Sequence, residues 1–138
     1  MTIGKPRFSD KYDYELLRFC TLLNTNVVGG ASKIFKYFLK TYSPKNIISY
    51  ADRRWSEGDL YKILGFDFSH NSGPNFYYFK QNDSTEKLFS RIAFQKHKLK
   101  DKLEDFDPKL SAWQNMQNHG YDRVWDCGNS VWVWSATN

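Results

Sequence analysis

The chain has 138 residues, of which 41% are hydrophobic and 18% aromatic, and its formal net charge is +5. This length suits one domain with its own core, and the apolar and aromatic content excludes an intrinsically disordered chain. No apolar run approaches the roughly 20 residues that span a membrane, and the N-terminus lacks the apolar segment of a secretory signal. Because the two cysteines lie far apart in the chain, we expect no disulfide framework and a reducing, cytoplasmic location.

The first third of the chain alternates between strand and helix patterns. Residues 14–20 form an apolar-rich run that is typical of a buried strand, although its periodicity does not exclude a helix. Residues 33–40 place apolar side chains at helical spacing between lysines, and Ser43-Pro44 ends this helix. Residues 46–50 are apolar and β-branched, which predicts a second buried strand.

A short helix and two further strands are expected next. Residues 56–64 carry apolar side chains at helical spacing, and Gly65 ends the helix because glycine takes a positive φ without steric cost. Residues 66–69 and 75–80 then predict strands that are joined by a turn-rich connector.

The last third predicts a basic helical segment, a short helix and a β-hairpin. Residues 86–103 are interpreted as partly helical, and a short helix begins at Asp107-Pro108 and ends before Gly120. Residues 121–125 and 131–134 are predicted strands on either side of a Cys-Gly turn, which is a hairpin signal.

The chain also contains an internal echo. Residues 60–79 and 115–134 both predict a helix, a glycine, a strand, a glycine-containing turn and an aromatic strand, with Gly65 and Gly120 at corresponding positions. A duplication and two copies of a common supersecondary motif both remain open as explanations.

A glycine-rich turn lies between the first predicted strand and the first predicted helix. Its residues are Val28, Gly29, Gly30, Ala31, Ser32 and Lys33. Backbone N–H groups at such a turn and the helix dipole favour an anion, and Lys33 adds a positive charge. The alternative is a tight turn in which Ser32 caps the helix. The spacing matches neither the P-loop nor the dinucleotide fingerprint.

The order of these elements resembles the GNAT acyltransferase superfamily. The loop Asn26-x-x-Gly29-x-Ala31 is similar to the family's pyrophosphate loop, Gln/Arg-x-x-Gly-x-Gly/Ala, with Asn26 in place of Gln or Arg. Leu60-Tyr61-x-x-Leu64-Gly65-Phe66 is similar to its Leu-Tyr-x-x-x-Gly-Phe signature. The resemblance implies a truncated GNAT-like core over residues 1–82, with acetyl-CoA as the cofactor that residues 28–33 would bind.

A second resemblance covers nearly the whole chain. Motifs such as Ile48-Ser-Tyr-Ala-Asp-Arg, His70-Asn-Ser-Gly-Pro-Asn, Phe94-Gln-Lys-His-Lys-Leu and Gly120-Tyr-Asp-Arg-Val-Trp-Asp-Cys-Gly-Asn resemble, in this order, the C-terminal region of phage-encoded homing-endonuclease-like proteins. In those proteins a nuclease domain normally comes first. The resemblance therefore implies a DNA-associated module of phage origin that lacks its own nuclease site and acts in the cytoplasm of an infected bacterial host.

Positive charge is concentrated between residues 91 and 102, where Asp101 is the only acidic residue. The stretch contains Arg91, Lys96, His97, Lys98, Lys100 and Lys102. Lysines that alternate with apolar residues neutralise phosphates while the apolar side chains pack, and in a helix Lys98 and Lys102 would share a face. The alternative is a solvated cationic face over a core of apolar residues from the same segment.

Asp52-Arg53-Arg54-Trp55 follows the predicted strand 46–50 at its carboxyl end, where ligands bind in open α/β sheets. Arginines fork onto phosphates or guanine edges, and Trp55 would stack on a base. The alternative is a local Asp–Arg pair with Trp55 packed over the sheet.

No catalytic constellation is recognisable in the sequence. His70, His97 and His119 fall in three different connectors, and no His-x-Glu, His-Asn-His or paired-cysteine pattern occurs. The catalytic residues therefore remain unknown, and no metal site is expected.

These observations predict an α/β (α+β) fold for residues 1–138 as a single domain. A mixed, mainly antiparallel GNAT-like sheet with flanking helices would occupy residues 1–82, and the basic segment with the C-terminal helix and β-hairpin would occupy residues 83–138. The expected function is a DNA-binding or accessory module, with a nuclease domain as a further partner and no membrane partner.

Two other functions remain open. One is an acyl-CoA-dependent transferase that modifies nucleic acid, and the other is a phage protein that binds and disables a host protein through exposed aromatic side chains. An exposed sheet edge would favour a homo-oligomer.

Overall fold

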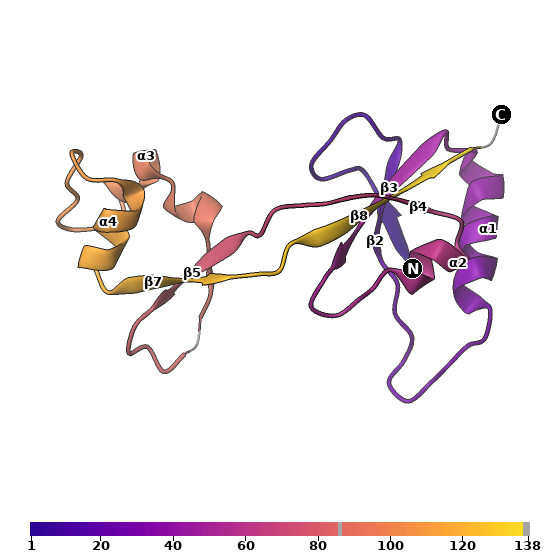
Figure 1. Ribbon diagram of the computed structural model, residues 1–138, viewed down its shortest axis with the longest axis horizontal. Helices are drawn as coiled ribbons and strands as arrows, with labels where there is room; N and C mark the ends of the chain where they lie inside the picture. Colours follow the sequence, from indigo (N-terminus) through magenta and orange to yellow (C-terminus); the bar gives the residue numbers. More distant parts are fainter. Residues whose placement is uncertain (86, 137–138) are drawn as a thin grey trace. The chain divides into compact units, whose positions relative to one another are not determined.

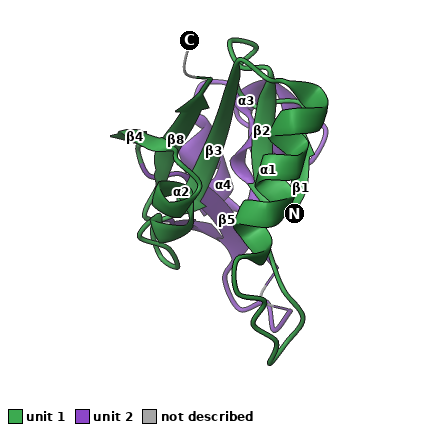
Figure 2. Ribbon diagram, turned by 90° about the vertical axis from the view of Figure 1, so that its right-hand side faces the viewer, with its two compact units in different colours: residues 1–73, 127–138 green, residues 74–126 purple. Residues whose placement is uncertain are grey.

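The structure, a computed structural model, describes residues 1–85 and 87–136. The chain forms two units: unit 1 consists of residues 1–73 and 127–138, and unit 2 consists of residues 74–126 (Figure 2). Unit 2 is thus an insertion into unit 1, and the boundaries differ from the division predicted at residues 82 and 83. In the described part of the chain, no helix is both long and apolar enough to cross a membrane.

Unit 1 contains a five-stranded mixed sheet in the order β1-β2-β3-β8-β4. The strands are β1 (Thr2–Gly4), β2 (Tyr14–Arg18), β3 (Asn46–Asp52), β4 (Asp67–Asn71) and β8 (Asn129–Ser135). Strands β2 and β3 are parallel, because helix α1 (Gly30–Tyr42) returns the chain to the same end of the sheet, and the other pairs are antiparallel (Figure 1). A second helix, α2 (Asp59–Ile63), links β3 to β4.

The core of unit 1 lies between the sheet and the two helices. Phe35 of α1 packs with Leu16 of β2, Ile47 of β3 and Trp132 of β8, and all four side chains are buried. Each such side chain stabilises the unit by about 1.5–3 kcal/mol relative to an exposed one. The apolar stripe that predicted an amphipathic helix is therefore the face of α1 that covers the sheet.

Glu15 lies on strand β2 and is fully buried. Its Oε2 accepts the backbone N–H of Arg7 at 2.8 Å, and its Oε1 accepts Nε and Nη2 of the same arginine at 2.9 Å and 2.6 Å. Phe8 contacts the ring of Tyr50 edge to face, with centroids 5.5 Å apart. These contacts hold the loop of residues 5–13 against the strands.

Unit 2 contains a three-stranded antiparallel sheet in the order β6-β5-β7. The elements of this unit are β5 (Phe76–Lys80), β6 (Phe89–Ser90), the 3-10 helix η1 (Arg91–Phe94), α3 (Lys96–Leu99), α4 (Ala112–Asn118) and β7 (Tyr121–Trp125). Its own core consists of Tyr78, Phe94, Leu99, Leu103 and Met116. The predicted α+β class is confirmed by the two sheets together with helices α1 to α4.

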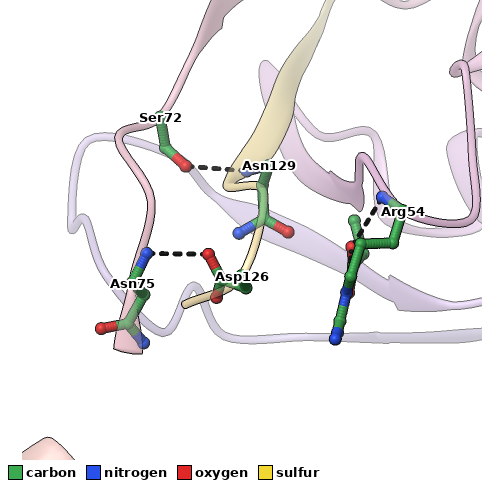
Figure 3. A network of polar contacts seen from close by, with 6 residues as sticks. Arg54, Ser72, Asn75, Asp126 and Asn129 are labelled. Atoms are coloured by element: carbon green, nitrogen blue, oxygen red, sulfur yellow. Dashed lines mark hydrogen bonds and ion pairs between the residues drawn. The ribbon is translucent and has the colours of Figure 1, made fainter. Parts of the chain in front are cut away.

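The predicted C-terminal β-hairpin is wrong, because β7 and β8 do not pair with each other. Strand β7 pairs with β5 in unit 2, whereas β8 pairs with β3 and β4 in unit 1. The turn signal at residues 126–129 instead marks the place where the chain returns to unit 1. There the Asp126 carboxylate accepts the Asn75 N–H at 2.7 Å, and Ser72 Oγ accepts the Asn129 N–H at 2.9 Å (Figure 3).

The internal echo has a counterpart in the pairing of the strands. Gly65 (φ 81°) precedes β4 and Gly120 (φ 75°) precedes β7, each after a short helix. The first strand of each copy pairs with the second strand of the other, β4 with β8 and β7 with β5. This reciprocal pairing agrees with either explanation of the echo, and duplication stays a prediction.

Candidate functional sites

The loop that follows β3 is fixed by its own arginines. Arg53 donates its backbone N–H to the Gly128 carbonyl at 3.2 Å and its Nη1–H to the Cys127 carbonyl at 3.1 Å. Arg54 forms an ion pair with Asp52, with Nη2 2.6 Å from Oδ2. Hydrogen bonds from Arg54 hold the pKa of the Asp52 carboxyl below its usual value. The alternative of a local Asp–Arg pair is therefore confirmed.

Trp55 in the same loop is 84% exposed. The alternative in which it packs over the sheet is wrong, because the backbone turns away at this point: the N–H groups of Trp55 and Ser56 both donate to the Asp52 carbonyl at 3.0 Å. An exposed indole is a large apolar surface, and covering it with a planar partner would be energetically favourable.

A pocket of about 390 Å³ lies beside this loop, within unit 1. The strands β4 and β8, the loop after β3 and helix α2 all contribute to it. The lining side chains belong to Arg53, Ser56, Glu57, Lys62, Phe68, Asn71, Ser130 and Trp132. Only Arg53 of this set was among the candidate residues predicted from the sequence. Phe68, Asn71, Ser130 and Trp132 come together through the non-local β4–β8 pairing, which no motif in the sequence signals.

The glycine-rich turn forms the start of α1. Gly29 is the N-cap residue with φ 71°, no side chain caps the helix, and the Lys33 N–H donates to the Gly29 carbonyl at 3.0 Å. Ser32 lies in the first turn of α1, so the alternative in which it caps the helix is wrong. A Cβ at Gly29 would meet nothing within 4 Å, and Val28 is 92% exposed. All six predicted residues are thus contiguous at an open, uncapped helix end.

Helix α1 also carries a cationic face, of which only Lys33 was among the predicted site residues. Lys33, Lys36 and Lys40 are exposed and take part in no ion pair among the described residues. Spacings of three and four residues place them on one side of the helix, over about 10 Å of its length. The spacing is visible in the sequence and is the signal that would have marked this face.

The basic segment of unit 2 is not one helix. η1 and α3 are separated at Gln95, whose backbone is extended, and α3 ends at Leu99. The segment is partly helical, as predicted, but Lys102 lies beyond α3, so the helix in which Lys98 and Lys102 would share a face does not form. Phe94, Leu99 and Leu103 of the segment are in the core of unit 2, as the alternative interpretation of the segment has it.

The cations of this segment fall into two groups. Three have partners within unit 2: Lys98 Nζ donates to the Ile92 carbonyl at 3.1 Å, Lys102 Nζ lies 5.0 Å from the Phe94 ring, and the Arg91 guanidinium lies 5.8 Å from the Phe76 ring. Lys96, His97 and Lys100 are exposed and have no side-chain partner in the part of the chain that the structure describes.

The remaining titratable residues that the structure describes form no recognisable catalytic group. His70 Nδ1 lies 3.0 Å from Ser69 Oγ, and His119 Nδ1 lies 2.7 Å from the Asn115 carbonyl oxygen. Among residues 1–85 and 87–136, no group of three or more His, Cys, Asp or Glu side chains is placed to hold a metal ion. Comparison of the chain with known protein families, with curated proteins and with solved structures finds no match. The sites are therefore interpreted from their own chemistry.

Proposed function

We propose that this chain is a DNA-binding accessory module of a phage homing-endonuclease-like protein, acting in the cytoplasm of an infected bacterial cell. The observation that supports the proposal is the pair of free lysines, Lys96 and Lys100, on the exposed surface of unit 2. A lysine that is not paired with an acidic side chain is available to bind a phosphate. This binding is favourable because it releases condensed counterions from the nucleic acid.

Within this proposal the basic residues have different roles. Lys96 and Lys100 contact phosphates, whereas Lys98 and Lys102 hold the segment in shape through the contacts of their ammonium groups. In unit 1, Arg53 remains an available cation, since in the part of the chain that is described its guanidinium bonds only to a neutral carbonyl. The charge of Arg54 is largely compensated by Asp52.

Fluorescence anisotropy with a labelled generic duplex at several salt concentrations tests this proposal. The variant carrying both Lys96→Ala and Lys100→Ala should bind every sequence more weakly. The slope of log K against log[salt] should fall in magnitude by about 1.8, since each phosphate contact contributes about 0.9. A variant with Lys5→Ala and Lys11→Ala is the matched control, because it removes the same charge from exposed lysines of unit 1.

The comparison separates specific contacts from the effect of net charge. If both double variants lose the same slope, general attraction to a basic protein explains the binding and the assignment to residues 91–102 is wrong. If the wild-type chain shows no salt-dependent affinity for the duplex, the proposed function itself fails.

The start of α1 supports a second candidate function, binding of the pyrophosphate of acetyl-CoA. The supporting observation is the uncapped N-terminus of α1, with open space around Gly29, in a parallel β2–α1–β3 unit. A ligand that binds the native state alone raises its stability, so acetyl-CoA should raise the Tm of the chain. Lys33→Glu should abolish the increase, whereas Lys40→Glu in the last turn should keep it. An unchanged Tm at millimolar acetyl-CoA would exclude this candidate.

A further inference from the structure

The pocket of unit 1 has a floor of aromatic side chains that is fixed in place. Trp132 is 4% exposed, stacks on Tyr61 with centroids 5.8 Å apart, and contacts Phe68 edge to face at 5.6 Å. Its indole Nε1–H donates to Ser130 Oγ at 2.9 Å, which fixes the orientation of the ring. Phe68 remains 53% exposed, so one aromatic surface of the floor is free to contact a ligand.

Gly58 allows the wall of the pocket, formed by the loop after β3 and the start of α2, to pack against this floor. Its φ is 88°, and a Cβ at this position would lie 2.1 Å from Cζ2 of Trp132. Only glycine combines this backbone conformation with such a close approach. The loop after β3 and the start of α2 therefore pack closely against the indole. Within the loop, Ser56 Oγ accepts the Gly58 N–H at 3.1 Å. Specific contacts therefore fix both the aromatic floor and the wall of the pocket.

The polar lining of the pocket combines two cations with neutral and anionic groups. Arg53 and Lys62 bring positive charge, and among the described residues only one of the Arg53 guanidinium N–H groups is used, toward the Cys127 carbonyl. Lys62 shares its charge with Asp59, 2.9 Å away at an exposed position, where a salt bridge holds the lysine only weakly. These groups suit a ligand with an anionic end.

The remaining polar side chains of the pocket suit recognition of a planar polar ring. The Asn71 amide and the Glu57 carboxylate make no hydrogen bond among the described residues, so both the donors and the acceptors are available. Register pairs Asn71 with Ser130 and Phe68 with Trp132 across β4 and β8, which sets the amide beside the aromatic floor. A volume of about 390 Å³ lies within the range of small-molecule sites.

We infer that this pocket binds a single nucleotide, with the base against Phe68 and read by Asn71 and Glu57, and with the phosphate at Arg53 and Lys62. The inference deepens the DNA-binding proposal and rests on it for the natural source of the nucleotide, which is a strand end or an unpaired position. Unstacked bases are recognised in this way, by an aromatic surface together with hydrogen bonds to their polar edges.

Titration of the ¹⁵N-labelled full chain with 2′-deoxyadenosine 5′-monophosphate (dAMP), followed by NMR, tests the inference. The indole N–H signal of Trp132 and the side-chain amide of Asn71 should shift together, with one affinity. Deoxyadenosine and inorganic phosphate, as separate probes, should each bind at least about tenfold more weakly than dAMP, because each makes only part of the contacts.

Two variants with matched controls locate the two ends of the nucleotide. Phe68→Ala should weaken dAMP binding at least about fivefold, the lower range for loss of one stacked base, whereas Leu22→Ala at an exposed loop position should not. Arg53→Ala should weaken dAMP but leave deoxyadenosine unchanged, and Arg18→Ala is its control. Unchanged spectra away from the pocket confirm that each variant is folded.

The source of the nucleotide is distinguished by two oligonucleotides. A 5′-phosphorylated single strand that shifts the Trp132 signal, while a blunt, unphosphorylated duplex does not, identifies strand ends. A response to dAMP alone identifies a free nucleotide. No shift of the Trp132 indole with millimolar dAMP, or equal responses of Phe68→Ala and the wild type, overturns the inference.

Failure of the inference can be told apart from failure of the proposed function. The Lys96→Ala and Lys100→Ala variant should lose duplex affinity and retain dAMP binding. A chain that binds dAMP but no duplex contradicts the proposed function alone, and a chain that binds duplex in a salt-dependent manner but ignores dAMP contradicts the pocket alone.

Discussion

Glu15 is a carboxylate in the interior of unit 1, and Arg7 is its only ion-pair partner among the described residues. Removing one member of such a pair leaves the other charge buried and uncompensated. We therefore expect Arg7→Ala to lower the free energy of unfolding by about 2–3 kcal/mol, measured by urea denaturation. Arg18→Ala, on the same strand but exposed, should change it by no more than about 0.5 kcal/mol.

A double variant isolates the cause of that loss. Adding Glu15→Gln to Arg7→Ala removes the buried charge and should recover part of the stability, which an ordinary packing defect would not do. A double variant that is less stable than either single variant would show that the loop of residues 5–13 is held by contacts other than this ion pair.

The ion pair of Asp52 and Arg54 leads to a prediction about how stability depends on pH. Hydrogen bonds from Arg54 lower the folded-state pKa of Asp52, so the pair stabilises the protein above the unfolded pKa of aspartic acid, about 3.9. The contribution is lost as the pH falls through the lower, folded pKa. Arg54→Ala should raise the pKa of Asp52 toward about 3.9 in a carboxyl ¹³C NMR titration, whereas Arg53→Ala should leave it low.

Single residues show where prediction from the sequence succeeded. Gly65 was predicted to end a helix, and its φ of 81° agrees, because a glycine after an apolar helical repeat is a local signal. Glu15 was not recognised as a buried charge, since its partner Arg7 lies on a separate loop and no pattern within β2 distinguishes it from an exposed glutamate. The same holds for Gly58, whose contact with Trp132 joins distant parts of the chain.

At the scale of the element, helix α4 depends on its first turn. Ser111 Oγ accepts the Gln114 N–H at 3.2 Å, and Gln114 Oε1 accepts the Ser111 N–H at 2.9 Å, which together form a capping box. Ser111→Ala should destabilise the protein by about 1 kcal/mol, as judged from chemical denaturation, because it leaves one N-terminal N–H without its partner. Ser84→Ala, at an exposed loop position, serves as the control, and an equal loss in both would remove the cap as the cause.

Elements with a local pattern were the predictable ones. The continuous apolar run of β3 and the helical stripe of α1 both reflect burial of side chains, so composition along a few residues reveals them. The partners of β7 and β8 could not be found in this way, because strand pairing is decided over separations of 40 residues and more. A local turn signal at residues 126–129 therefore predicted a hairpin that does not form. The pocket was missed for the same reason, since the β4–β8 pairing brings part of its lining together.

At the scale of the whole molecule, unit 2 occupies the position of a hairpin loop between β4 and β8. The last paired residues are Asn71 and Ser130, and the Ser72 N–H then donates to the Asn129 carbonyl at 2.8 Å. Gly73 and Gly128 approach closely, because a Cβ on Gly128 would lie 3.2 Å from the Gly73 carbonyl oxygen. The core residues of unit 1 all come from the segments on either side of the insertion.

These facts predict that unit 1 folds without unit 2. Deletion of residues 74–126 would join Ser72 to Asn129 through Gly73-Cys127-Gly128, a three-residue loop that ends in a glycine with φ 72°. Three-residue hairpin loops commonly place such a left-handed residue at this point. The shortened chain should retain the backbone NMR shifts of α1 and β3 and unfold in one cooperative transition. A broad transition with loss of those shifts would mean that unit 1 needs the insertion in order to fold.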